Sequence, residues 1–172
     1  IMIYDGRWKK ELKKHDRAIA FWRKLSFCGD IAKHQLNRAV LYSATILRKM
    51  VEEETEAKAF ATKENITLGK IVVINASLNA IRCPYNGEEG WTFRGKLCAM
   101  NYGEGQSVCV KAKDVCNWLL HSYVWGVAFN ENRKGFAVFF VASDFDKEKF
   151  VHYISFEEWR KLLVLAIENG AI

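Results

Sequence analysis

The sequence predicts an α+β fold: an N-terminal helical hairpin packed on a mostly antiparallel sheet of about five strands, with a closing C-terminal helix. Up to about residue 58, apolar residues recur in steps of three and four, which is the spacing of one helix face. From residue 67 onward, short apolar segments alternate with turn signals, as in strands joined by tight turns. A chain of 172 residues fits a single domain, 1–172.

The helical hairpin is expected over residues 7–60. Its first helix, residues 7–26, has one apolar stripe, formed by Trp8, Leu12, His15, Ile19 and Trp22. Gly29 can end this helix and Asp30 can cap the second, which is expected to run from residue 31 to about residue 58. Four glutamates lie near the end of the second helix, at 52, 53, 54 and 56. An antiparallel pairing brings them toward Arg7, Lys9 and Lys10, where they could neutralise part of the charge of the first helix.

The sheet is expected over residues 67–155. Segments that are rich in Ile and Val, or that alternate apolar with polar residues, predict its strands at 70–78, 91–102, 107–113, 123–129, 136–143 and 150–155. Asp114 can cap a short helix between two of these strands, at 115–122. A capping-box pattern opens the last helix, 156–169.

The excess positive charge of the chain lies in residues 7–24. This stretch has eight basic and two acidic residues and is therefore +6, which equals the net charge of the whole chain with its 26 basic and 20 acidic residues. Six of its cations project from the arc opposite the apolar stripe: Lys9, Lys10, Lys13, Lys14, Arg17 and Lys24. We expect this face to bind an acidic protein or a nucleic acid; the alternatives are a solvated face without a partner and a membrane surface.

The segment 114–122 contains the side-chain types of a nucleophilic site. Asn117 and His121 lie four residues apart and share one helix face, and Cys116 lies close by in the sequence. Because Cys116 and His121 diverge on a helix, a catalytic site here needs a further group from elsewhere in the chain. The alternative is a half-buried histidine with an Asn partner. A ligand pocket around His121 would be lined by Trp118, Tyr123, Trp125, Phe139 and Tyr153.

Metal, cofactor and membrane signals are weak. Asp144, Asp146 and Glu148 alternate and could bind Mg²⁺ or Ca²⁺, but they lack the glycine and spacing of an EF-hand, so they are first of all a polar turn. The sequence predicts no cofactor. The longest apolar run, 136–142, is too short to span a membrane. The cysteines have no metal-binding spacing and indicate reduced thiols in a cytoplasmic protein; they are Cys28, Cys83, Cys98, Cys109 and Cys116.

These observations favour a small cytoplasmic interaction protein over an enzyme, with the basic first helix as its contact surface. A small hydrolase or ligand-binding domain with an aromatic pocket around His121 is the alternative function. A homodimer formed through exposed aromatic residues of the sheet is compatible with either function.

Overall fold

The computed structural model describes residues 6–25, 27–67, 72–84, 105–130, 134–143 and 149–169, apart from the side chains at 123, 124 and 143. Within these ranges the chain forms four helices and a five-stranded antiparallel sheet, so the α+β fold expected from the sequence is confirmed. The elements are α1 (Gly6–Trp22), α2 (Gly29–Lys63), β1 (Ser77–Pro84), β2 (Gln106–Lys111), α3 (Ala112–Leu120), β3 (Ser122–Phe129), β4 (Phe136–Ser143), β5 (Phe150–Ser155) and α4 (Phe156–Asn169).

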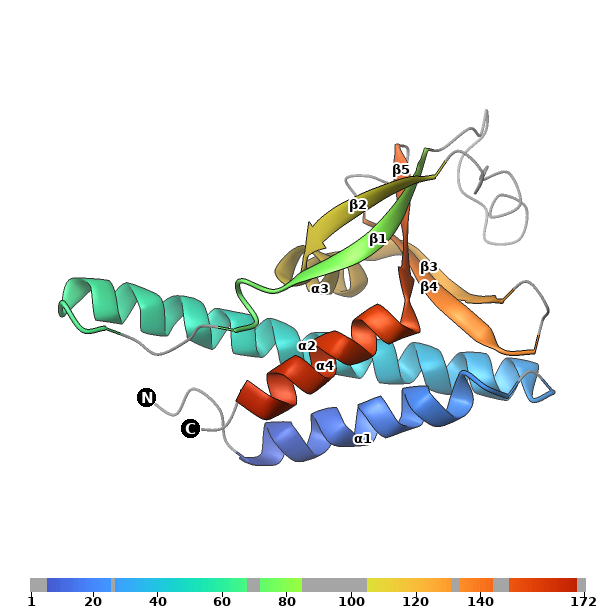
Figure 1. Cartoon of the computed structure of the whole chain (residues 1–172), viewed down its shortest axis with the longest axis horizontal. Coiled ribbons are helices and arrows are strands. Elements are labelled where there is room, and N and C mark those ends of the chain that lie inside the picture. Colours follow the sequence, from blue (N-terminus) through green and yellow to red (C-terminus); the bar gives the residue numbers. More distant parts are fainter. Residues whose placement is uncertain are drawn as a thin grey trace.

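The sheet has the strand order β2-β1-β5-β4-β3, and each neighbouring pair is antiparallel. Figure 1 shows α1 and α4 on the same side of the sheet, with the long helix α2 running behind them. α1 packs on both α2 and α4, and α3 packs between α2 and the sheet. The helices therefore cover one face of the sheet, and α1 forms the outermost layer.

The main core lies between the helices and the covered face of the sheet. Trp159 of α4 and Phe139 of β4 are fully buried there, and their rings meet edge to face with centroids 5.4 Å apart. The Trp159 indole N–H donates a hydrogen bond to Ser43 Oγ at 2.9 Å, and the Ser43 hydroxyl donates to the Val40 carbonyl at 3.0 Å. The buried indole is thus satisfied, which ties α4 to the middle of α2.

A smaller apolar cluster lies on the opposite face of the sheet. Because side chains alternate along a strand, Cys83, Val151 and Tyr153 point away from the helices. Phe140 and Ala142 of β4 complete this cluster, and all five side chains are buried. Aromatic side chains of the sheet are therefore divided between two faces, with Phe139 on one and Phe140 and Tyr153 on the other.

The prediction of a strand at 70–78 is wrong in its position. β1 begins at Ser77, and residues 72–76 belong to no strand. The buried carboxylate of Glu54 on α2 accepts the backbone N–H groups of Val72 (3.2 Å), Val73 (3.1 Å) and Ile74 (2.6 Å). These three N–H groups are bonded to a side chain of α2 and are not available to a neighbouring strand. This explains why an Ile- and Val-rich segment forms a turn and not a strand.

Three elements, β4, β5 and α4, have the predicted ends, and Ser155 Oγ accepts the Glu158 N–H at 3.1 Å, as half of a capping box. α1 ends earlier than predicted, at Trp22, and Gly29 begins α2 with Cys28 as the N-cap, so Asp30 lies in the first turn of α2. α2 is longer than predicted and ends at Lys63. α3 begins at Ala112 with Lys111 as the N-cap, so Asp114 lies in its first turn instead of capping it. The strand expected at 91–102 lies outside the described residues.

Candidate functional site

The outer side of α1 carries five cations, and a sixth lies in the turn just after the helix; together they form the basic face, which consists of Lys9, Lys10, Lys13, Lys14, Arg17 and Lys24. The opposite side of the helix, with Leu12, His15 and Ile19, is buried against the rest of the protein. Lys9 is half-buried and the other five cations are exposed. The amphipathic pattern of the sequence therefore places the cations toward solvent, on the outermost helix of the fold.

Charged contacts fix the orientation of α1 on α4. The Arg160 guanidinium donates to both carboxylate oxygens of Asp16, at 2.7 and 3.3 Å. This paired contact raises the pKa of Arg160 further above its ordinary value. Arg23 forms a second ion pair with Glu157, at 3.5 Å. Both contacts use residues beside the buried stripe, so they hold the helix while its outer arc stays exposed.

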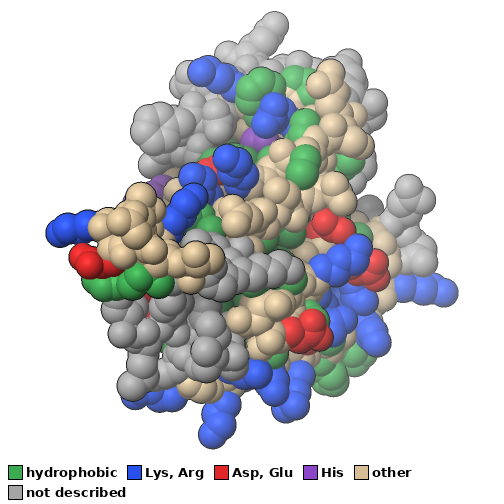
Figure 2. All heavy atoms as spheres, turned by 60° about the vertical axis from the view of Figure 1, so that its left-hand side comes forward, with side chains coloured by type: hydrophobic (Ala, Val, Ile, Leu, Met, Phe, Trp, Pro, Cys, Tyr) green, Lys and Arg blue, Asp and Glu red, His purple; other side chains and the backbone are tan. Residues whose placement is uncertain are grey.

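Carboxylates neutralise little of the basic face. Within the described part of the chain, Lys14 is the one cation of this face with an ion pair, a 3.8 Å contact with Glu11 on its own helix. Among the described residues, no ion pair joins Lys9 or Lys10 to the glutamates near the end of α2, although the sequence suggested this pairing. Glu52 pairs with Arg48 and Lys49 on α2, at 3.1 and 3.6 Å, and Glu54 binds backbone N–H groups. Figure 2 shows Lys and Arg side chains along the lower edge of the molecule, at the height of α1 in Figure 1.

The buried stripe of α1 contains one titratable group that the sequence placed there. His15 lies edge to face with Tyr42 of α2, with ring centroids 5.8 Å apart. Burial lowers the pKa of His15, which the Glu11 carboxylate partly offsets. A neutral His15 therefore lies at the helix interface, and it adds no charge to the basic face at neutral pH.

The nucleophilic residues near α3 are not assembled into a site. Cys116 is fully buried, and burial raises the pKa of its thiol to about 12. The Asn117 side-chain oxygen accepts a hydrogen bond from the Arg48 guanidinium. His121 is exposed at the C-terminal end of α3, where its backbone N–H donates to the Asn117 carbonyl. The histidine and the thiol therefore lie in different environments, one in solvent and the other in the core.

The aromatic residues expected to line a pocket around His121 are also separated. Trp118 stacks on the buried His152, with ring centroids 4.3 Å apart. Phe139 and Trp125 face the main core, whereas Tyr153 lies on the opposite face of the sheet. Tyr123 lies in β3, but its side chain is not among those that the structure describes. The described members of the set therefore do not line one cavity.

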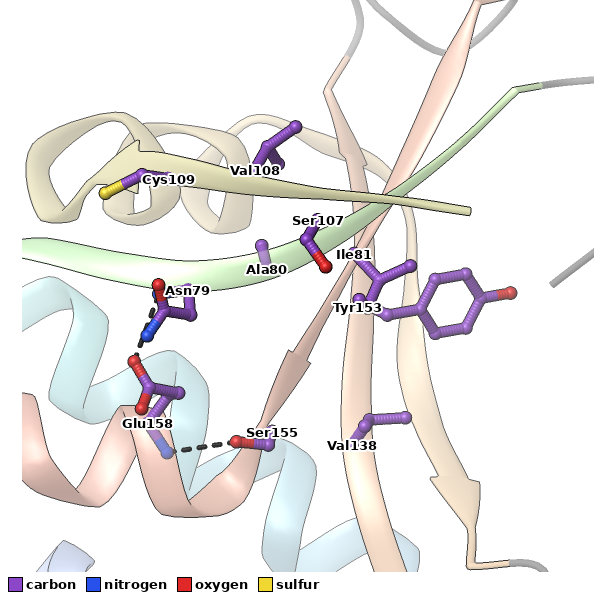
Figure 3. A pocket seen from close by; sticks show the side chains of 10 residues that line it. All are labelled: Asn79, Ala80, Ile81, Ser107, Val108, Cys109, Val138, Tyr153, Ser155 and Glu158. Carbon is purple, nitrogen blue, oxygen red and sulfur yellow. Dashed lines mark hydrogen bonds between the residues drawn. The ribbon is translucent and has the colours of Figure 1, made fainter. Parts of the chain in front are cut away.

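A cavity that the sequence did not indicate lies on the open face of the sheet, next to the start of α4 (Figure 3). It has a volume of about 530 Å³ and its polar groups are mainly bonded to each other. Glu158 accepts the Asn79 backbone N–H at 3.0 Å and the Lys161 ammonium at 2.9 Å. These contacts, the Asn79 N–H above all, lower the pKa of Glu158. Both oxygens of this carboxylate are thus occupied, so the cavity offers no free charge for a ligand.

Metal binding and membrane insertion have no support in the described residues. The candidate metal ligands Asp144, Asp146 and Glu148 lie outside them, and the described His, Cys, Asp and Glu side chains form no group of three that could hold an ion. Across the same ranges, each helix is too short or too polar to cross a bilayer. Cys28, Cys83, Cys109 and Cys116 are free thiols, and Cys98 lies outside the described residues.

Comparison of the chain with protein-family models, with curated proteins and with solved structures finds no match. The function is therefore argued from the geometry alone, and the basic face of α1 is the surface with the clearest chemical character.

Proposed function

We propose that this protein binds nucleic acid through the basic face of α1, by contacts with the phosphate backbone. One observation carries the proposal: five cations project from the outer arc of α1 and a sixth, Lys24, follows its end, and five of the six have no ion-pair partner in the described part of the chain. Uncompensated cations on a surface attract a polyanion because binding releases its condensed counterions.

The fold supports this role by presenting the cations on a rigid frame. α1 has 17 residues and is therefore about 25 Å long. Its buried stripe and the Arg160–Asp16 contact fix its rotation, so the cations cannot turn inward without breaking the core. A row of charges along one helix favours binding to the backbone over recognition of bases, and we expect little sequence preference.

An acidic protein is the other partner that would be attracted to the positive charge of the basic face. A nucleic acid fits better because its charge is regular and continuous along the length of a helix, whereas acidic segments of proteins vary in spacing. The free thiols support a reducing compartment such as the cytoplasm as the place where this binding occurs.

The test is the salt dependence of binding to a labelled DNA duplex, measured by fluorescence anisotropy. If all six cations contact phosphates, the logarithm of the affinity falls against the logarithm of the salt concentration with a slope of about −5. A variant with Lys10→Gln, Lys13→Gln and Arg17→Gln removes half of these cations and halves the slope.

The matched control places the same charge change elsewhere. Lys58→Gln, Lys63→Gln and Lys111→Gln remove three exposed cations from α2 and β2, away from the basic face, and leave the slope unchanged. Equal effects of the two triple variants would show that net charge, and not this face, governs binding. Tighter binding of polyglutamate than of DNA would assign the face to an acidic protein.

A further inference from the structure

We propose that the basic face of α1 prefers single-stranded over duplex nucleic acid; this inference rests on the proposed function and names its ligand. The observation behind it is a pair of exposed aromatic rings, one among the cations and the other in the connection that follows them. Phe21 is 58 % exposed on α1, and Phe27 is 83 % exposed in the connection to α2. Single-strand-binding proteins combine cations for the backbone with aromatic rings on which bases stack.

The helix places Phe21 within the basic face. It follows Arg17 by four residues, a spacing that places both side chains on one side of the helix, and Lys24 lies in the turn just after the end of α1. The Phe21 ring meets the Trp22 ring edge to face, with centroids 5.1 Å apart and an interplanar angle of 86°. Phe21 thus remains exposed on the outer arc, although the neighbouring Trp22 is half-buried. A base can stack on this ring while the adjacent phosphates meet the two cations.

The basic surface continues past the end of α1. Lys24, Lys134 and the Arg23–Glu157 ion pair line a cavity of about 410 Å³ between the end of α1 and the β3–β4 turn. The Phe136 N–H donates to the Arg23 carbonyl at 2.7 Å, which holds that turn against the helix. A strand that stacks on the exposed rings can therefore meet further cations where it leaves the helix.

A lipid bilayer fits this surface less well. A helix that lies in a membrane interface has a continuous apolar face opposite its charges. In α1 that face is buried in the protein core, with Leu12 and Ile19 almost fully covered. The exposed Phe21 ring instead lies among the cations of the basic face. An isolated ring beside cations favours bases, and only unpaired bases are free to stack on it.

The experiment compares a 20-nucleotide single strand with a duplex of the same length at one salt concentration, by fluorescence anisotropy. We expect the wild-type protein to bind the single strand more tightly. The double variant Phe21→Ala, Phe27→Ala should weaken single-strand binding about fivefold to 100-fold for each ring and leave duplex binding unchanged. Phe60→Ala is the control, because this ring is 47 % exposed on α2, at the far end of the molecule.

The outcomes separate the two proposals. Equal affinities for the single strand and the duplex, with no effect of the double variant, overturn the single-strand preference even if the Lys10, Lys13 and Arg17 variant weakens binding to both. Failure of that charge variant to weaken either complex overturns the proposed function itself. Binding to vesicles that contain anionic phosphatidylserine, without binding to either DNA, overturns both.

Discussion

Glu54 offers a strong test of how this fold is held together. Its side chain is 3 % exposed, and its carboxylate accepts three consecutive backbone N–H groups, from Val72, Val73 and Ile74. We consider two substitutions. Glu54→Ala removes both acceptor oxygens and therefore all three bonds, whereas Glu54→Gln keeps one oxygen and replaces the other with an amide that is itself a donor.

The expected magnitudes follow from the bonds. Leaving a buried N–H without an acceptor costs about 1–3 kcal/mol, so the loss of three such bonds in Glu54→Ala should lower the free energy of unfolding by about 3–9 kcal/mol. Glu54→Gln can retain the bonds of Oε1 to Val72 and Val73 but places its amide against the Ile74 N–H, at a cost of about 2 kcal/mol. Since small domains have about 5–15 kcal/mol in total, the alanine variant should be near the limit of folding.

Urea denaturation followed by tryptophan fluorescence measures these differences. Glu56→Ala is the matched control, because Glu56 lies one helical half-turn away on α2 and is exposed. We expect the control to change the free energy of unfolding by less than about 0.5 kcal/mol. If Glu54→Ala behaves like this control, the carboxylate does not hold residues 72–74, and our explanation of where β1 begins is wrong.

Three further predictions concern the core and its pH dependence. Ser43→Ala should cost about 1–3 kcal/mol, measured in urea, because the Trp159 indole N–H loses its acceptor. Gly135→Ala should cost about 1–3 kcal/mol in the same assay, because the added Cβ would lie 2.6 Å from the Arg23 carbonyl oxygen. Since burial lowers the pKa of His15 in the folded state, the unfolded chain binds the proton more tightly. The free energy of unfolding should therefore fall as the pH drops from about 7.5 through 6.5 to 5.5, and the fall should be smaller in His15→Leu; equal falls in both proteins would exclude His15 as a cause.

Local sequence pattern predicts the elements whose partners are near in the chain, and it fails where a distant group intervenes. The ends of β5 and α4 agree with prediction because alternation and a capping box encode them locally. The start of β1 does not, since Val72, Val73 and Ile74 have strong strand propensity but bind a carboxylate 18 to 20 residues earlier. No pattern within residues 70–78 could have indicated this contact.

The same distinction applies to the candidate site. The rotation of α1 follows from its amphipathic periodicity, so the basic face could be predicted from spacing alone. Residue spacing could not show whether a pocket forms around His121. Phe139 and Tyr153 lie on opposite faces of the sheet, and this depends on how the strands pair. The exposure of Phe21 agrees with the helical spacing that places it near Arg17, but that of Phe27 depends on how the two helices are connected.

The unequal lengths of the two N-terminal helices have a dynamic consequence. α2 has 35 residues and α1 has 17, and Figure 1 shows α2 extending well past the start of its partner. Beyond Glu54, the buried residues of α2 are Ala57 and Ala61, two small side chains. The last two turns can therefore unwind and re-form without disturbing the interior. In deuterated solvent, amide protons there should exchange far sooner than those of the preceding turns, which would make this end of the helix a separate, low-stability unit of the protein.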